Sequence, residues 1–241
     1  MFERIDPKKA FVWIAIAFLA YILITSAGSE QILDKLLILP GLILALTIHE
    51  FSHAKMADKL GDPTPGAQGR LTFNPLEHMD IAGTICLFVA GFGWGKPVQV
   101  NPTYFRNPAR DNMLVALAGP LSNMILAFIL FFLYGILYYF LPLDQIWGKI
   151  LIIMIQSGAY INLTLGLFNL LPVPPLDGSK ILPYFLPSKG KSFIWALEKY
   201  SFIIIAILFF TELPRIIIWP ATNWIANGMQ NIVSIIIGPF I

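Results

Sequence analysis

Long apolar runs, each about the length of a membrane span, constrain this chain more than any other feature of its sequence. A helix needs about 20 mostly apolar residues to cross a bilayer. We expect such helices at about residues 10–27, 36–58, 111–140, 150–170, 192–210 and 213–237. The sequence therefore predicts an all-α polytopic membrane protein, with six transmembrane helices in a single domain of residues 1–241. The 10–27 run also fits a signal-peptide core, but its length favours a retained helix.

The scarcity of charged residues excludes most other protein classes. Only 12% of the residues are charged and 57% are hydrophobic, whereas an average soluble domain is about 25% charged. A soluble domain could not cover its surface with so few polar side chains, and a disordered chain would be poor in apolar residues. The single cysteine, Cys86, excludes a disulfide scaffold. The net charge of +2 gives no support for nucleic-acid binding.

Residues 61–110 differ from the apolar runs because they are rich in Gly and Pro. Their longest apolar stretch, 81–90, is too short to cross a bilayer as a helix and is better explained as re-entrant or interfacial. Residues 66–73 and 98–100 have strand-like character between turn residues. We therefore expect a small membrane-associated β-hairpin or re-entrant loop between the second and third spans.

The distribution of Lys and Arg predicts the orientation. Six spans place both termini and residues 61–110 on one side of the membrane. Of the 16 Lys and Arg residues, three fall on the opposite side: Lys35, Lys149 and Arg215. Because basic loops stay in the cytoplasm, we expect a multi-pass protein of the cell membrane. Its termini and the opening of any functional site near residues 61–110 would face the cytoplasm.

The second expected span contains a His49-Glu50-x-x-His53 motif. Residues four apart lie on one face of a helix, so both imidazoles can reach a single tetrahedral zinc ion. Glu50, beside them, could take a proton from metal-bound water. The alternative is a solvated helix end, since charged residues follow at 55–59. The apolar stretch before the motif favours a site, because His and Glu in a span are costly unless they are bound or paired.

Two histidines leave a third protein ligand to be found. The candidates are Asp58, Glu77, His78, Asp80 and Asp177. Glu77 would suit a soluble protease that takes a downstream glutamate. Asp177 follows three prolines that break the fourth span at its cytoplasmic end, and therefore lies at the same membrane depth as the motif. On this reasoning Asp177 is the most interesting candidate, and the others remain open.

Several separated motifs together resemble the site-2 protease family of intramembrane zinc metalloproteases, in a compact form without a PDZ domain. They occur in the family's order at residues 49–53, 69–75, 93–98, 119–123 and 169–178. The resemblance implies that His49, His53 and Asp177 bind one zinc ion and that Glu50 is the general base. It also implies that Asn123 assists substrate binding or stabilises the oxyanion, and that Asn169 orients the metal-binding loop.

The same resemblance implies a substrate class. Members of the family cleave single-pass membrane proteins in the bilayer, such as anti-sigma factors or remnant signal peptides. Because a transmembrane helix hides its amides in internal hydrogen bonds, it must be unwound before cleavage. An exposed strand edge at 66–73 or 97–101 could hold the unwound segment by β-addition. The competing interpretations are a metal transporter or channel that uses the His and Asp residues, and a non-catalytic membrane scaffold.

Overall fold

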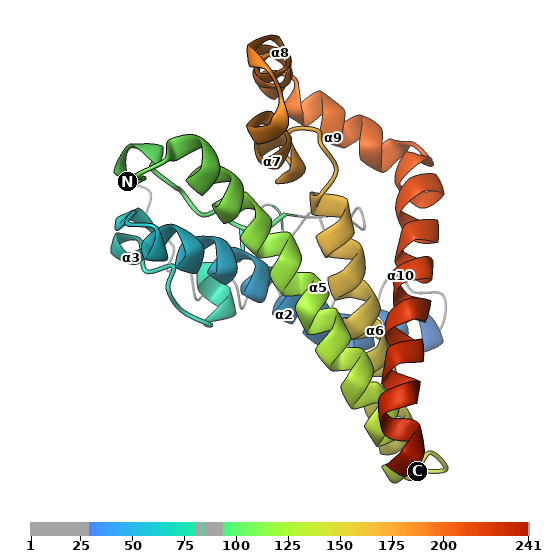
Figure 1. Ribbon diagram of the computed structural model, residues 1–241. Helices are drawn as coiled ribbons and strands as arrows, with labels where there is room; N and C mark the ends of the chain where they lie inside the picture. Colours follow the sequence, from blue (N-terminus) through green and yellow to red (C-terminus); the bar gives the residue numbers. More distant parts are fainter. Residues whose placement is uncertain (1–28, 81–82, 84–93, 241) are drawn as a thin grey trace, which may run out of the picture.

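Four long helices form the frame of the described chain: α2 (Ser29–Lys59), α5 (Pro108–Phe140), α6 (Ile146–Asn169) and α10 (Leu213–Ile237). The structure is a computed structural model that describes residues 29–80, 83 and 94–240 (Figure 1). Within these residues, three helices are long and apolar enough to cross a membrane, namely Leu36–Lys59, Pro108–Phe140 and Ile146–Asn169. The expected first span, 10–27, lies outside the described residues.

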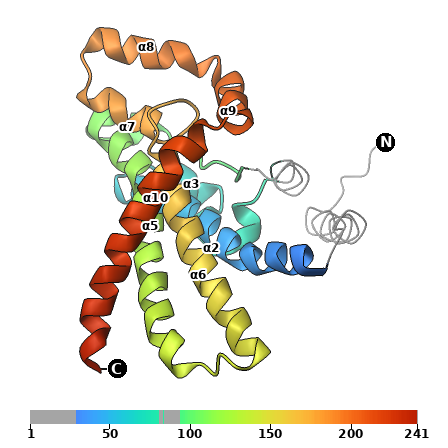
Figure 2. The ribbon, with the colours of Figure 1, turned by 90° about the vertical axis from the view of Figure 1, so that its right-hand side faces the viewer.

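α5 and α6 lie side by side and run antiparallel, α10 packs along both, and α2 crosses them (Figures 1 and 2). The largest buried apolar cluster joins α5, α6 and α10; its members are Ala127, Phe131, Ala159, Leu163, Ala226, Val233 and Ile237. A smaller cluster of Ala57, Phe105 and Val115 joins the end of α2 to the start of α5. The functional site described below lies where α2 and α5 cross.

The crossing of α2 and α6 brings two backbones together without intervening side chains. A Cβ atom added to Gly41 of α2 would lie 2.6 Å from the Cα atom of Gly158 of α6. Small residues at helix crossings allow this close approach in membrane proteins. The crossing therefore fixes α2 against α6.

The expected span at 192–210 is wrong as a single helix. The chain instead forms α8 (Ser188–Glu198) and α9 (Ser201–Phe210), which run in different directions (Figures 1 and 2). Charged residues at 189, 191, 198 and 199 leave Ser201–Phe210 as the uncharged, mostly apolar part. Its 10 residues span about 15 Å as a helix, half of the hydrocarbon core. The expected last helix, 213–237, has the bounds of α10.

The strand-like segments expected within 61–110 are also wrong for the described residues, which contain no strand. Met79 and Gly95 form one isolated bridge. Its described residues include the short helices α3 (Thr64–Ala67), η1 (Pro75–Glu77) and η2 (Pro102–Tyr104). Gly69, in the expected 66–73 strand, has a φ of 70°, which is a turn conformation. Except for Gly83, the expected re-entrant stretch 81–90 lies outside the described residues.

Asn-Pro pairs explain why helical turns replace the expected strands. Asn74, Asn101 and Asn107 each accept a backbone N–H bond from the turn that follows, and each is followed by proline at the first helical position. Asparagine is a preferred N-cap, and proline at the first helical position loses no hydrogen bond. The third pair starts α5, so the segment ends by setting the start of a candidate membrane span.

Candidate metal centre

His49, His53 and Asp177 converge on one buried point. The two histidine Nε2 atoms are 3.0 Å apart, and the Asp177 Oδ2 atom lies 3.1 Å from the first and 3.2 Å from the second. All three residues are at most 8% exposed. The two histidines come from consecutive turns of α2, and Asp177 directly precedes α7 (Gly178–Phe185). The structure thus joins residues that are more than 120 positions apart in the sequence.

The chemistry and spacing of these three atoms fit a metal ion. The His53 Nδ1 atom donates to the Val115 carbonyl at 2.7 Å, because a carbonyl only accepts. A histidine held in this way at Nδ1 presents its Nε2 lone pair when it ligates a metal. Donor atoms that surround a tetrahedral zinc ion at 2.0–2.1 Å are about 3.3 Å apart, close to the separations found here. The buried Asp177 Oδ2 atom faces both imidazole nitrogens, and a cation between the three atoms would satisfy it.

The loop between α6 and α7 holds Asp177 in place. A Cβ atom at Gly178 would lie 2.3 Å from the Leu170 and Leu171 carbonyl oxygens. The turn therefore folds back onto the end of α6 so closely that only glycine fits. Burial alone would raise the pKa of the Asp177 carboxyl, but the adjacent imidazoles of His53 and His49 outweigh burial and hold this pKa below its ordinary value. A carboxylate in this position can serve as an anionic metal ligand.

Gly119 of α5 lies directly over the two imidazoles. A Cβ atom at this position would be 2.3 Å from the His53 Nε2 atom and 2.8 Å from the His49 Cε1 atom. Any other residue would therefore displace the ligands. Gly119 has no polar side chain, but its lack of a Cβ atom leaves the space that the two imidazoles occupy.

Glu50, the predicted base, is half-buried and follows His49 on α2. Its Oε2 atom accepts a hydrogen bond from the Val98 N–H group at 3.1 Å. Gly95 lies against the same side chain, since a Cβ atom there would be 3.5 Å from the Glu50 Oε1 atom. The segment around residues 94–98 therefore orients the Glu50 carboxylate.

The two predicted asparagines have different surroundings. Asn123 is completely buried, and neither amide atom has a hydrogen-bond partner among the described residues. It follows Gly119 by four residues, and so lies on the same face of α5, about 6 Å further along the helix. Asn169 instead donates to the Leu165 carbonyl of its own helix at 3.0 Å. Its predicted role in orienting the metal-binding loop remains a prediction.

The other candidate third ligands do not join the two histidines. Among the described residues, His49, His53 and Asp177 are the one group of three that could hold a metal ion. His78 is buried and bonds through Nε2 to the Thr72 carbonyl at 2.7 Å, so it organises its own loop. Asp58 pairs with Lys55 on the surface of α2.

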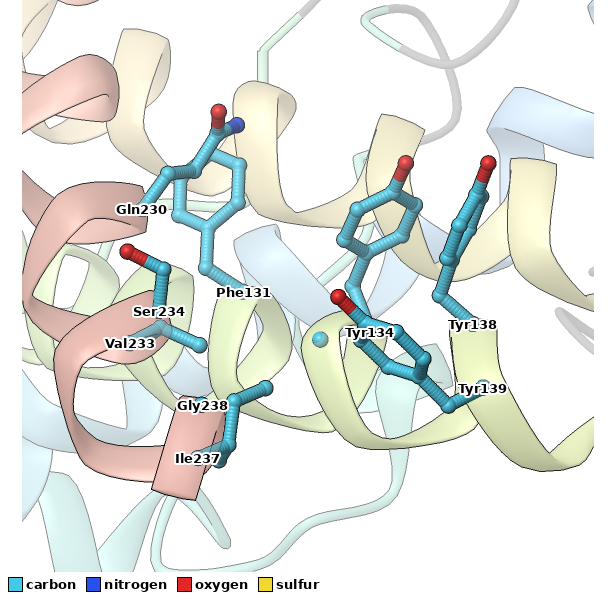
Figure 3. Close-up of a pocket in the computed structure, with 10 residues that line it drawn as sticks. Phe131, Tyr134, Tyr138, Tyr139, Gln230, Val233, Ser234, Ile237 and Gly238 are labelled. Carbon is cyan, nitrogen blue, oxygen red and sulfur yellow. The ribbon is translucent and has the colours of Figure 1, made fainter. Parts of the chain in front are cut away.

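A separate hollow of about 220 Å³ lies between α5 and α10 (Figure 3). Its walls carry the tyrosines Tyr134, Tyr138 and Tyr139 on α5, and Gln230 and Ser234 on α10. None of the three clustered ligands lines it, so it is distinct from the metal centre.

Two histidines one helical turn apart, a carboxylate from another element and an adjacent glutamate form the arrangement that metal-dependent hydrolases use. Comparisons with known proteins agree with this class. The model of Peptidase family M50 matches residues 136–211. YwhC of Bacillus subtilis is 40% identical over 208 residues, which cover 83% of this chain and 92% of that protein.

Two further relatives support the assignment. Rip2 of Mycobacterium tuberculosis is 32% identical over 180 residues, or 72% of this chain and 66% of that protein. MJ0611 of Methanocaldococcus jannaschii is 32% identical over 192 residues, or 79% and 88%. All three are named as candidate zinc metalloproteases. The chain belongs to peptidase family M50, and the predicted resemblance to site-2 proteases is confirmed. No solved structure matches the chain.

Sequence reasoning assigned no role to Gly119 or to the Val115 carbonyl, and it did not anticipate the contact of the Val98 N–H group with Glu50. The Gly119-Pro120 pair inside an apolar helix was a usable signal for the first, since such a helix has little use for glycine unless something approaches it closely. The other two contacts are made by backbone groups, which carry no residue signature.

Proposed function

We propose that the protein is an intramembrane zinc metalloprotease that hydrolyses peptide bonds within or near the transmembrane segments of other membrane proteins. The observation that carries the proposal is the convergence of His49, His53 and Asp177 within 4.8 Å, next to Glu50. The ligands lie on or next to helices that are long and apolar enough to span a bilayer. The transporter alternative is not favoured, because a transit path needs several such clusters and the described residues contain one.

In this proposal the chain's own residues divide the work. His49, His53 and Asp177 hold one zinc ion, and zinc is the metal in the names of the relatives. When bound, zinc lowers the pKa of its water to about 7 and polarises the scissile carbonyl. Glu50 takes a proton as general base and passes it to the leaving amine. The Val98 N–H bond holds the Glu50 carboxylate in one orientation for both transfers.

We assign Asn123 to the oxyanion that develops on the scissile carbonyl. Its amide is buried without a partner among the described residues, and it lies one helical turn beyond Gly119, which contacts both imidazoles. A pre-positioned donor of this kind stabilises developing charge without reorganisation. Asn169 would act indirectly, by holding the end of α6 from which the Asp177 loop departs.

The substrates would be single-pass membrane proteins, such as anti-sigma factors or remnant signal peptides, in a locally unwound form. Residues 97–101 lie in neither a helix nor a strand, and among the described residues the backbone N–H and C=O groups of Gln99 and Val100 form no hydrogen bond. This open edge could pair with an unwound substrate by β-addition.

The proposed topology places the metal centre at the cytoplasmic end of the spans. α2 and α6 end there and α5 begins there, so the chain directions of all three are compatible with one membrane depth. Most of the Lys and Arg residues belong to the segments on that side, which supports a cytoplasmic opening.

A comparison of cleavage by the wild type and by Glu50→Gln tests the proposal. Detergent-solubilised protein is incubated with tagged single-pass substrates, and bound zinc is measured in parallel. Loss of a general base lowers the rate by about 10²–10⁴-fold, whereas zinc content should be unchanged because Glu50 is not a ligand. Glu198→Gln, which alters an exposed glutamate on α8, is the matched control. Equal cleavage by the wild type and Glu50→Gln would overturn the proposal.

A further inference from the structure

Arg70 is a buried cation with an unusual set of partners. It is 3% exposed, and within the described part of the chain no carboxylate forms an ion pair with it. Its guanidinium instead donates to three backbone carbonyls, those of Glu77, Lys96 and Pro97. Burying a charge is costly unless hydrogen bonds satisfy it, so these carbonyls are what keeps Arg70 in place.

One of these carbonyls belongs to the peptide group that contacts Glu50. Arg70 Nη2 donates to the Pro97 oxygen at 3.3 Å, and the N–H of the same peptide group, on Val98, donates to Glu50 Oε2 at 3.1 Å. A peptide group is planar, so its C=O and N–H directions are rigidly coupled. A cation on the oxygen also polarises the group and makes its N–H a stronger donor. A single peptide bond thus connects Arg70 to Glu50.

The contacts of the other guanidinium nitrogen, Arg70 Nη1, also constrain the orientation of this peptide segment. Arg70 Nη1 donates to the Lys96 carbonyl at 3.2 Å and also to that of Glu77, so consecutive peptide groups are held by one rigid fork. The Lys96 N–H group donates to the His78 carbonyl at 2.8 Å. Only a planar guanidinium presents several donors at fixed angles; a lysine offers one point charge. The fork therefore fixes the rotation of the Pro97–Val98 peptide group as well as its position.

We propose that Arg70 is a positioning residue for Glu50, acting through the Pro97–Val98 peptide group. The kinetic consequence rests on the proposed proteolytic function; the structural link does not. Arg70 contributes neither a metal ligand nor a contact with the ligands. Its loss should therefore leave zinc bound while allowing the Glu50 carboxylate to rotate away from its working orientation.

The kinetic test compares Arg70→Gln, Arg70→Lys and Val98→Pro with the wild type. Val98→Pro removes the N–H donor while Arg70 remains. Misplacement of a catalytic group by about 1 Å costs about 10²-fold in rate, so kcat should fall by about that factor in Arg70→Gln and Val98→Pro. Arg70→Lys should recover part of the loss. KM and zinc content should change by less than about twofold, and the Arg70→Gln/Val98→Pro double variant should lose no more than either single variant. Arg106→Gln, which removes an exposed arginine from the same segment, is the control.

A second measurement needs no substrate and keeps the two proposals separable. A nitroxide is attached at Gln99→Cys in a Cys86→Ser background, and its mobility is recorded by electron paramagnetic resonance. Arg70→Gln and Arg70→Lys should increase the mobility at this position, and Arg106→Gln should not. If the wild type cleaves no substrate, the proposed proteolytic function is wrong. The spectra still test whether Arg70 holds the Pro97–Val98 peptide group. Unchanged mobility, additive losses in the double variant, or an unchanged kcat in both Arg70 variants would overturn the role of Arg70.

Discussion

Replacing Gly119 with alanine should empty the metal centre, although Gly119 is not a ligand. The new Cβ atom would lie 2.3 Å from the His53 Nε2 atom and 2.6 Å from its Cε1 atom. Non-bonded heavy atoms are at their optimum at about 3.5–4.0 Å, so the imidazole would have to retreat by more than about 1 Å. Metal–ligand distances tolerate only about 0.2 Å. The retreat therefore removes at least one ligand from the ion.

The expected loss of zinc affinity is at least about 100-fold, the upper end of what disturbing the support of a ligand costs, or about 2.8 kcal/mol. Competition with a chromophoric chelator on purified protein measures it. Gly228→Ala is one control, because a Cβ atom there meets nothing within 4 Å. Gly135→Ala is a second control, because Gly135 is on the same helix as Gly119 but a Cβ atom there would lie 2.8 Å from Val233 and Ile237 of α10, away from the metal. Wild-type zinc affinity in folded Gly119→Ala would refute the reasoning.

Three further substitutions separate ligand, oxyanion and scaffold roles. Asp177→Asn should lower zinc affinity by at least about tenfold, because it removes the anionic ligand; unchanged zinc stoichiometry at limiting zinc would reassign the third ligand. Asn123→Leu should raise stability by about 1 kcal/mol, because it removes a buried amide without partners, and should slow cleavage; a thermal melt and a cleavage assay that move together would contradict this. Asp62→Asn should cost about 1–3 kcal/mol without changing zinc content, because an amide NH₂ group would face a backbone or hydroxyl donor; a parallel loss of zinc would show that the Asp62 contacts extend to the site.

The ligand motif could be predicted because its geometry is local. His49 and His53 are four residues apart on one helix, so their shared face follows from helical periodicity alone. Asp177 required an argument about membrane depth together with the family resemblance, because nothing local connects it to the histidines. The structure brings it within 3.2 Å of both.

The errors lie where turn chemistry and charge compete with apolar patterning. The 66–73 stretch has strand-like character between turn residues, but Gly69 within it and the Asn74-Pro75 pair after it adopt turns. The helix expected at 192–210 gave weight to average apolarity, whereas the charges at 198 and 199 divide it. The roles of Gly119 and Arg70 depend on which backbone groups approach them, and that is a property of the fold rather than of residue type.

The bare backbone contact between Gly41 and Gly158 also has a mechanical meaning. α2 carries His49 and His53 away from this contact, and α6 leads away from it toward the loop that holds Asp177. His49 lies eight residues beyond Gly41, a distance of about 12 Å along α2. α6 continues for about 17 Å from Gly158 to Asn169. A rotation of α2 by about 5° about the crossing would move His49 by about 1 Å, which is enough to release a ligand. Because the two backbones are in direct contact at this crossing, it leaves little room for movement. The separation of the metal ligands is therefore controlled from more than 10 Å away. A transmembrane segment that packs against α2 or α6 and rotates it about this crossing would change the geometry of the metal centre without contacting it.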